Sequence, residues 1–88
     1  MHITRHMNVL KNILRLSKIE IVSLPDKPEE TTFAAKAHAS IIDKIVKKMG
    51  YHVEEELSLM TIYKNKDGIR LDLIPLDHKT TMLEFVNE

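Results

Sequence analysis

Two acidic side chains in the last third of the chain are the residues whose spacing suggests chemistry. Asp72 lies between two leucines, and Glu84 lies between a leucine and a phenylalanine. Side chains alternate between the two faces of a strand, so burial of the apolar neighbours places both acids on the opposite face. If the turn between the two strands is centred at His78, the acids lie directly opposite each other, with β-carbons about 5 Å apart.

Two carboxylates at that distance repel each other, and two arrangements relieve the repulsion. A hard divalent cation such as Mg²⁺ prefers carboxylate oxygens and would make Asp72 and Glu84 its ligands. Alternatively, Arg70 and Lys64 lie on the same side or rim of the sheet and neutralise the acids as salt bridges. The salt-bridged sheet is the preferred interpretation. No catalytic residue is therefore assigned, Asp72 and Glu84 are kept only as candidate metal ligands, and no cofactor is expected.

The segments around these acids resemble the core of PD-(D/E)xK nucleases. The resemblance rests on the segments KMGYHV (48–53), IRLDLI (69–74) and MLEFV (82–86). In that family an Asp on one strand and a Glu-x-Lys on the next form a Mg²⁺ site for phosphodiester hydrolysis. The resemblance implies that Asp72 is the first acid and Glu84 the second. Because a valine stands at position 86, where the family has its lysine, it implies an inactive nuclease-like core in a nucleic-acid-associated protein.

The elements that must position the acids follow from the periodicity of the apolar residues. Helical spacing predicts an N-terminal amphipathic helix over about residues 5–17. A run of β-branched residues over 18–24 indicates a short strand. A second, main helix is expected over about residues 33–49, where Gly50 supplies the left-handed residue that ends it.

The last part of the chain, from about residue 57 to residue 88, predicts a β-meander. Alternation with a period of two is interrupted by polar turns at 65–68 and 77–80. A first turn centred between positions 66 and 67 would pair Ile62 with Leu71 and place both on the face that packs against the main helix.

Size and composition indicate a folded α+β domain. We expect a single domain over residues 1–88 with the order α-β-α-β-β-β, in which a helix packs on one face of a mostly antiparallel, three- to four-stranded sheet. The chain has 43% hydrophobic and 30% charged residues, with 13 basic and 13 acidic side chains, which argues against an acidic nucleic-acid mimic. Cysteine is absent, which excludes disulfides and thiolate metal sites. No apolar run reaches the about 20 residues of a membrane span, so a cytoplasmic protein is expected.

His38 falls at the centre of the apolar face of the predicted main helix, where it is a candidate buried polar side chain. It is either a buried catalytic histidine or a core or interface histidine with one satisfied nitrogen. The second interpretation is preferred, because no serine or acid lies at a helical spacing that completes a triad. The remaining histidines are scattered along the chain and form no H-E-x-x-H motif, so a zinc site is not favoured.

The first 18 residues carry four basic side chains and no acidic one. These candidate interaction residues are Arg5, Lys11, Arg15 and Lys18. They form either the solvated side of a docked helix or a surface for an anionic partner, such as nucleic acid, a membrane or an acidic protein groove. Three glutamates at 54–56 offer an acidic counterpart within the chain or across a dimer, which favours protein assembly.

These features predict a small non-enzymatic protein–protein interaction or regulatory domain that forms a homodimer. A chain of this size buries only about 60% of its unfolded surface, and the apolar arc of the first helix, which includes Val9 and Leu16, requires cover. The expected partner is a protein or a second copy of the chain. The alternative is the nucleic-acid-associated protein implied by the nuclease resemblance.

Overall fold

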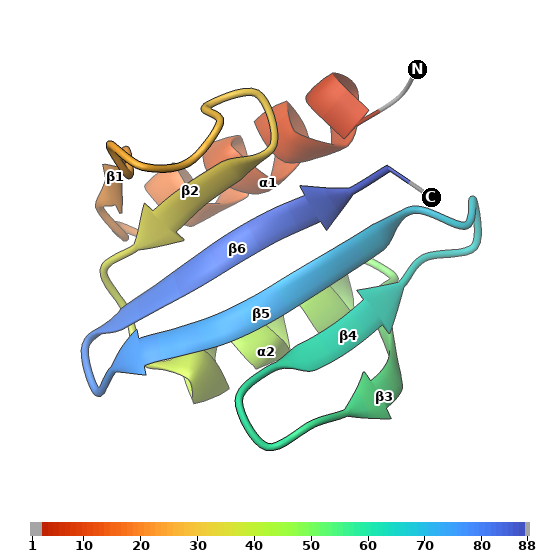
Figure 1. Ribbon diagram of the computed structural model, residues 1–88. Coiled ribbons are helices and arrows are strands. Elements are labelled where there is room, and N and C mark those ends of the chain that lie inside the picture. Colours follow the sequence, from red (N-terminus) through yellow and green to blue (C-terminus); the bar gives the residue numbers. More distant parts are fainter. Residues whose placement is uncertain (1–2, 88) are drawn as a thin grey trace.

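A computed structural model describes residues 3–87, in which two helices lie on one face of a six-stranded sheet (Figure 1). The helices are α1 (Ile3–Leu16) and α2 (Ala39–Lys48). The strands are β1 (Ile21–Val22), β2 (Thr32–Ala35), β3 (His52–Glu56), β4 (Thr61–Lys64), β5 (Arg70–Asp77) and β6 (Thr80–Val86). Their order in the sheet is β1-β2-β6-β5-β4-β3, and each neighbouring pair is antiparallel. The prediction of an α+β fold with an antiparallel sheet is confirmed.

The sheet has six strands rather than the predicted three to four, partly because β2 occupies residues that were predicted to begin the main helix. Ala34 and Ala35 in β2 favour a helix by propensity, but both are fully buried, one on each face of a strand that lies between β1 and β6. The pairing of β2 with β1 and β6 therefore outweighs the helical propensity of its alanines. The helix α2 therefore begins at Ala39 rather than near residue 33.

The other additional strand is β3, at the edge of the sheet. Every residue of β3 is exposed, and a bulge interrupts its pairing with β4 between Val53 and Glu55. The three consecutive glutamates at 54–56 remove the apolar alternation by which a half-buried strand is recognised. The meander therefore begins at His52, earlier than the predicted position near residue 57.

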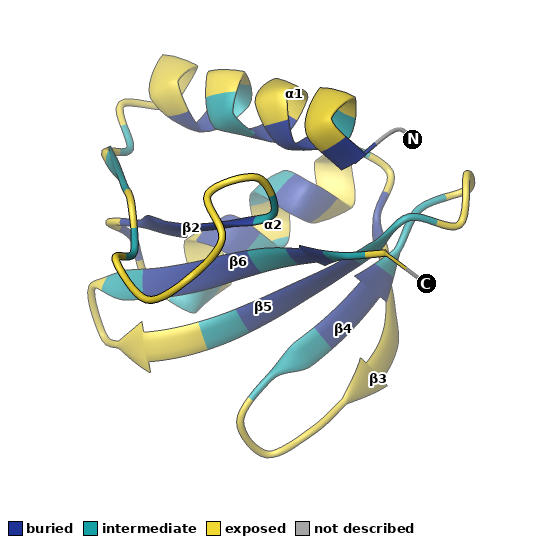
Figure 2. Cartoon of the chain, turned by 45° about the horizontal axis from the view of Figure 1, so that its top comes forward, coloured by how far each residue is buried: buried dark blue, intermediate teal, exposed yellow. Residues whose placement is uncertain are grey.

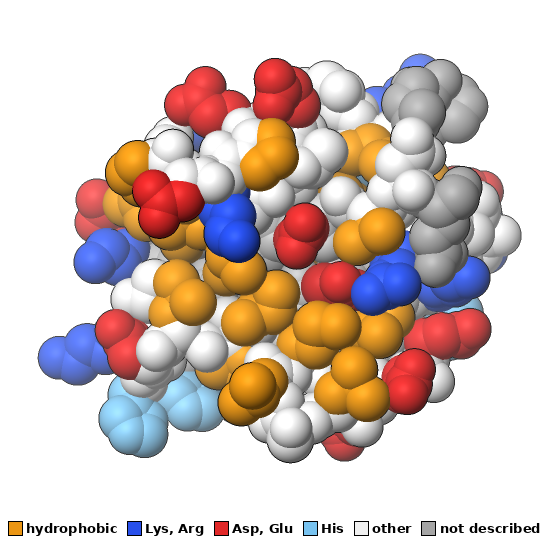
Figure 3. Space-filling model, in the orientation of Figure 1, with side chains coloured by type: hydrophobic (Ala, Val, Ile, Leu, Met, Phe, Trp, Pro, Cys, Tyr) orange, Lys and Arg blue, Asp and Glu red, His pale blue; other side chains and the backbone are white. Residues whose placement is uncertain are grey.

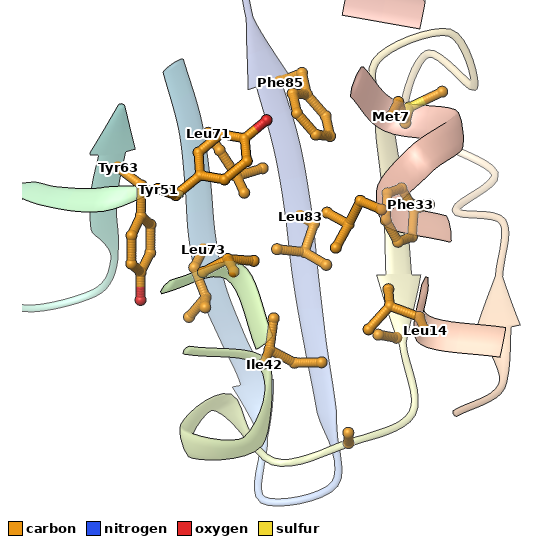
Figure 4. Close-up of a cluster of buried hydrophobic side chains, with 14 of the residues drawn as sticks. Met7, Leu14, Phe33, Ile42, Tyr51, Tyr63, Leu71, Leu73, Leu83 and Phe85 are labelled. Atoms are coloured by element: carbon orange, nitrogen blue, oxygen red, sulfur yellow. The ribbon is translucent and has the colours of Figure 1, made fainter. Parts of the chain in front are cut away.

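The hydrophobic core lies between the two helices and the sheet (Figures 2 and 4). The strands contribute odd-numbered side chains, among them Phe33, Tyr63, Leu71, Leu73, Leu83 and Phe85, and the helices contribute Met7, Leu10, Leu14, Ile42 and Val46. The four apolar neighbours of the two acids share this buried face, as predicted. Burying an aliphatic or aromatic side chain of this size contributes about 1.5–3 kcal/mol.

The buried side of α1 is narrower than the predicted apolar arc. The residues that face the sheet recur at intervals of three or four and are Ile3, Met7, Leu10 and Leu14. Val9 and Leu16 were predicted to belong to the apolar half, but they are 47% and 82% exposed. The docked face of α1 is thus a single stripe, and the rest of the helix faces solvent (Figure 2).

The register between β4 and β5 differs by one residue from the prediction. Ile62 pairs with Asp72, and Tyr63 pairs with Leu71. The cause is a longer turn in which Gly68 adopts a left-handed conformation with φ of 78°. A shift of one residue exchanges the faces, so Tyr63 enters the core and Ile62 lies on the other side of the sheet.

Candidate functional site

Both helices lie on the same side of the sheet, and neither lies on the opposite side, which we call the open face (Figures 1 and 3). The strand registers align its side chains in three rows that cross the strands. The cationic row contains His52, Lys64 and Arg70 and ends at Val86. The acidic row contains Glu55, Ile62, Asp72, Glu84 and Thr32. The apolar row contains Ile74, Met82, Ala34 and Val22.

The predicted acidic pair is present in the middle of the open face. Asp72 on β5 pairs directly with Glu84 on β6, which confirms the predicted pair. The turn itself pairs Asp77 with Thr80 instead of being centred at His78, and a bulge between Pro75 and Asp77 restores the predicted register. Arg70 binds the first acid with two hydrogen bonds, from Nε to Oδ1 at 2.9 Å and from Nη2 to Oδ2 at 3.0 Å. The side chain of Asp72 is only 5% exposed, so this guanidinium is its close counter-ion.

The hydrogen bonds between Arg70 and Asp72 oppose the binding of a metal ion at this pair of acids. Both oxygens of Asp72 accept hydrogen bonds from Arg70, so a cation that binds there has to displace the guanidinium. Within residues 3–87, no group of three or more histidine, aspartate or glutamate side chains is arranged to hold a metal ion. Val86, at the position that corresponds to the lysine of the nucleases, pairs with Arg70.

The apolar row gives the open face a hydrophobic centre. Ala34 and Met82 are 0% and 8% exposed, while Ile74 and Val22 are half-buried. Figure 3 shows hydrophobic side chains gathered over the middle of this face, with acidic and basic side chains among and around them. An apolar strip bordered by charges is typical of a surface that meets another protein.

His38 is not a buried residue of a helix interior, and that prediction is wrong. It is exposed and forms the N-cap of α2, where its Nδ1 accepts a hydrogen bond of 3.1 Å from the backbone N–H of Ser40. The reason is β2, which delays the start of the helix. The ring of His38 lies parallel to that of His78, with 6.3 Å between their centroids.

The four basic residues near the N-terminus have different surroundings. Arg5 and Arg15 are exposed on α1. The ammonium group of Lys11 lies 5.2 Å from the centroid of the Phe33 ring, a cation–π contact at the edge of the core. Lys18 lies beyond the end of the helix with a left-handed φ of 65°. The α1 surface is therefore less uniformly basic than the sequence suggests.

The sequence gives no indication of a polar cluster that joins α2 to β4. Asp43 accepts a hydrogen bond of 2.5 Å from the hydroxyl of Tyr63, and its other oxygen lies 3.1 Å from Nζ of Lys47. Partial burial tends to raise the pKa of Asp43, but these two partners lower it overall. Burial raises the pKa of Tyr63, and the adjacent carboxylate raises it further. Asp43 is thus a charged hydrogen-bond acceptor and Tyr63 a neutral donor, an arrangement that suits a structural contact between α2 and β4.

Comparisons of the chain with protein-family models, with curated proteins and with solved structures returned no match. Neither helix of the described residues is long and apolar enough to cross a membrane.

Proposed function

We propose that this chain is a small non-enzymatic interaction or regulatory protein, and that it forms a homodimer through the open face. The observation that carries the proposal is the apolar row on a sheet face that neither helix covers. Ile74 and Val22, the two half-buried members of the row, still expose apolar surface, and its burial against a second copy supplies a hydrophobic driving force. The absence of cysteine fits the reducing cytoplasm, where we propose that the protein acts.

Charge complementarity supports a second copy as the occupant. The acidic row flanks the apolar row on one side. The exposed cations Lys36 and Lys79 lie towards the other end of the sheet, near the turn between β5 and β6, where the exposed acids Glu20 and Asp77 also lie. A two-fold axis that crosses the strands at the apolar row places the apolar row of one copy against the apolar row of the other. The same axis brings the acidic row of one copy over Lys36 and Lys79 of the other.

The oligomeric state of two matched variants tests the homodimer. We expect the wild-type chain to be dimeric at high micromolar concentration in light scattering, and Ile74→Glu to be monomeric, because it places a charge in the apolar row. Ile41→Glu is the control, since it makes the same substitution at a 47% exposed position in α2 on the helix side. Circular dichroism verifies the fold of each variant. A wild-type monomer under these conditions contradicts the proposal.

Glu84→Lys is a second variant that does not threaten the fold. It removes the like-charge contact with Asp72, so the thermal stability of the monomer should equal or exceed that of the wild type. In the dimer, however, the new cation meets Lys36 and Lys79 of the partner copy, and we expect at least tenfold weaker association. A dimer that is as tight as the wild type would exclude the proposed two-fold arrangement.

The direct pairing of Asp72 with Glu84 favours one other candidate, a nucleic-acid-associated protein with an inactive nuclease-like core. Here the two acids bind Mg²⁺ after Arg70 moves aside. This function predicts that millimolar Mg²⁺ or Mn²⁺ raises the midpoint of thermal unfolding, and that Asp72→Ala and Glu84→Ala each abolish the rise. The absence of a rise in the wild-type chain eliminates this candidate.

A further inference from the structure

A cleft on a different part of the molecule has features of a ligand site. It lies where the first turns of α1 meet the end of α2 and the turn between β4 and β5, and its volume is about 410 Å³. A second hollow, of about 350 Å³, adjoins it and shares Arg5, His6 and Asp67. Volumes of this size are typical of small-molecule sites.

Tyr51 lines the cleft and carries a buried hydroxyl group that has no hydrogen-bond partner within the described residues. Only 4% of this residue is exposed, and its ring lies edge-on to Phe85 in the core (Figure 4). Burial raises the pKa of Tyr51 to about 12; the nearby Asn65 side chain acts to lower it, and the charge of Asp67 acts to raise it. The hydroxyl therefore keeps its proton at neutral pH and is a donor without an acceptor, which costs free energy unless a ligand supplies one.

Asn65 contributes a second donor to the same wall. Its Oδ1 is occupied, because it accepts hydrogen bonds of 2.9 Å from the backbone N–H groups of Asp67 and Ile69. This arrangement fixes the side chain so that Nδ2 faces His6, at 3.5 Å from Nδ1 of that ring. The amide hydrogens of Asn65 thus lie on the cleft side of a rigid turn.

The surroundings combine positive charge with an apolar wall. Arg5 and Lys66 line the cleft, and no acidic residue occurs in the first turn of α1, where the helix dipole is positive. The one acid of the lining, Asp67, is 60% exposed and lies 4.0 Å from Nε2 of His6. Val9 and Met49 provide the apolar part of the lining. Donors and cations outnumber acceptors, so the fitting ligand is an acceptor-rich anion with an apolar body.

We propose that this cleft binds a small organic carboxylate, with the carboxylate accepting from the Tyr51 hydroxyl and the Asn65 amide, Arg5 or Lys66 as its counter-ion, and the apolar body against Val9 and Met49. The inference does not depend on the proposed dimer, because the open face contributes none of these residues.

Titration with three probes, followed by the backbone amide signals in NMR, tests the proposal. The probes are 2-naphthoate, the neutral analogue 2-naphthalenemethanol, and inorganic phosphate. We expect naphthoate to shift the signals of Gly50, Tyr51 and residues 65–67 in a saturable manner. The alcohol should bind at least tenfold more weakly because it lacks the charge, and phosphate should not saturate because it lacks the apolar body. Shifts that are absent, or spread over the whole surface, overturn the proposal.

Two variants separate binding from folding. Tyr51→Phe removes only an unpaired buried hydroxyl, so its thermal stability should equal or exceed that of the wild type, whereas its affinity for naphthoate should fall at least fivefold. Arg5→Gln should weaken binding by a similar factor, and Arg15→Gln, an exposed position elsewhere on the same helix, should not change it. Unchanged affinity in both Tyr51→Phe and Arg5→Gln would overturn the site.

Discussion

Tyr63 on β4 donates a hydrogen bond of 2.5 Å to Asp43 on α2, and this polar contact joins the second helix to the sheet. The donor residue is buried, whereas the acceptor side chain is 31% exposed and also pairs with Lys47. The free energy that this hydrogen bond contributes to stability can be measured by substituting either residue.

We expect Tyr63→Phe to lower the free energy of unfolding by about 1–2 kcal/mol, because a hydrogen bond to a charged group is lost while Asp43 remains partly solvated. Chemical denaturation measures the change. Lys47→Ala is the control: it breaks an exposed ion pair within one helix, and the loss should stay below about 0.5 kcal/mol. A larger loss for Lys47→Ala than for Tyr63→Phe would contradict this ranking.

The same contact predicts a dependence of stability on pH. The pKa of Asp43 in the folded chain lies below its ordinary value of 3.8, so its contribution is present above pH 3.8 and is lost as the pH falls through the folded pKa. Asp43→Asn should therefore show a smaller loss of stability than the wild type on acidification through this window. Tyr63→Phe should show an intermediate slope. Parallel pH profiles for the wild type and Asp43→Asn would disprove the linkage.

Lys18 offers a stabilising substitution. It adopts a φ of 65° just beyond α1, where the backbone N–H of Ile19 donates to the carbonyl of Leu14 at 2.9 Å. Glycine occupies this conformation without the steric cost that a side chain incurs. We expect Lys18→Gly to raise the free energy of unfolding by about 0.5–1 kcal/mol. Lys18→Ala removes the same charge but keeps the strain, so it should give no gain.

The N-cap of α2 offers a second stabilising substitution. Histidine is not among the preferred N-cap residues, although Nδ1 of His38 accepts from the Ser40 N–H at 3.1 Å. His38→Asp should raise the free energy of unfolding by about 0.5–1 kcal/mol, because a carboxylate caps the helix and also interacts favourably with its dipole. His38→Ala should lower it by about 0.5–1 kcal/mol. Equal stability of His38→Ala and the wild type would show that the observed cap contributes nothing.

Arg70 provides a test of the buried charge on the open face. Arg70→Leu leaves Asp72 buried beside Glu84 without its guanidinium, and we expect a loss of about 3 kcal/mol. The double variant Arg70→Leu/Asp72→Leu should recover most of this loss, because it removes both charges. A double variant that is less stable than Arg70→Leu would mean that the pair acts through other contacts.

The sequence was sufficient to predict those parts of the fold in which local pattern and tertiary packing agree. Leu71, Leu73, Leu83 and Phe85 alternate with polar residues, so their common face and the juxtaposition of the two acids could be predicted. The turn at 77–80 alone does not set that register, because a bulge between Pro75 and Asp77 shifts the pairing by one residue.

Other features depend on contacts between distant parts of the chain. The alanines of β2 are buried only because β1 and β6 flank them, and no local pattern distinguishes them from a helix. The turn at Gly68 is one residue longer than a two-residue hairpin turn, which exchanges Ile62 and Tyr63 between the faces. The lining of the cleft, including Tyr51 and Asn65, comes from three separate regions of the sequence and was not foreseen.

The two ends of the sheet constrain how copies of the chain can meet. One end is β1, which is only two residues long, and the other is β3, which is interrupted by a bulge and carries three adjacent negative charges. Short, irregular or highly charged edges are poor templates for an added strand. Growth of the sheet by strand addition, the route towards fibrous aggregates, is therefore disfavoured at both ends, and any specific self-recognition is directed to a face instead.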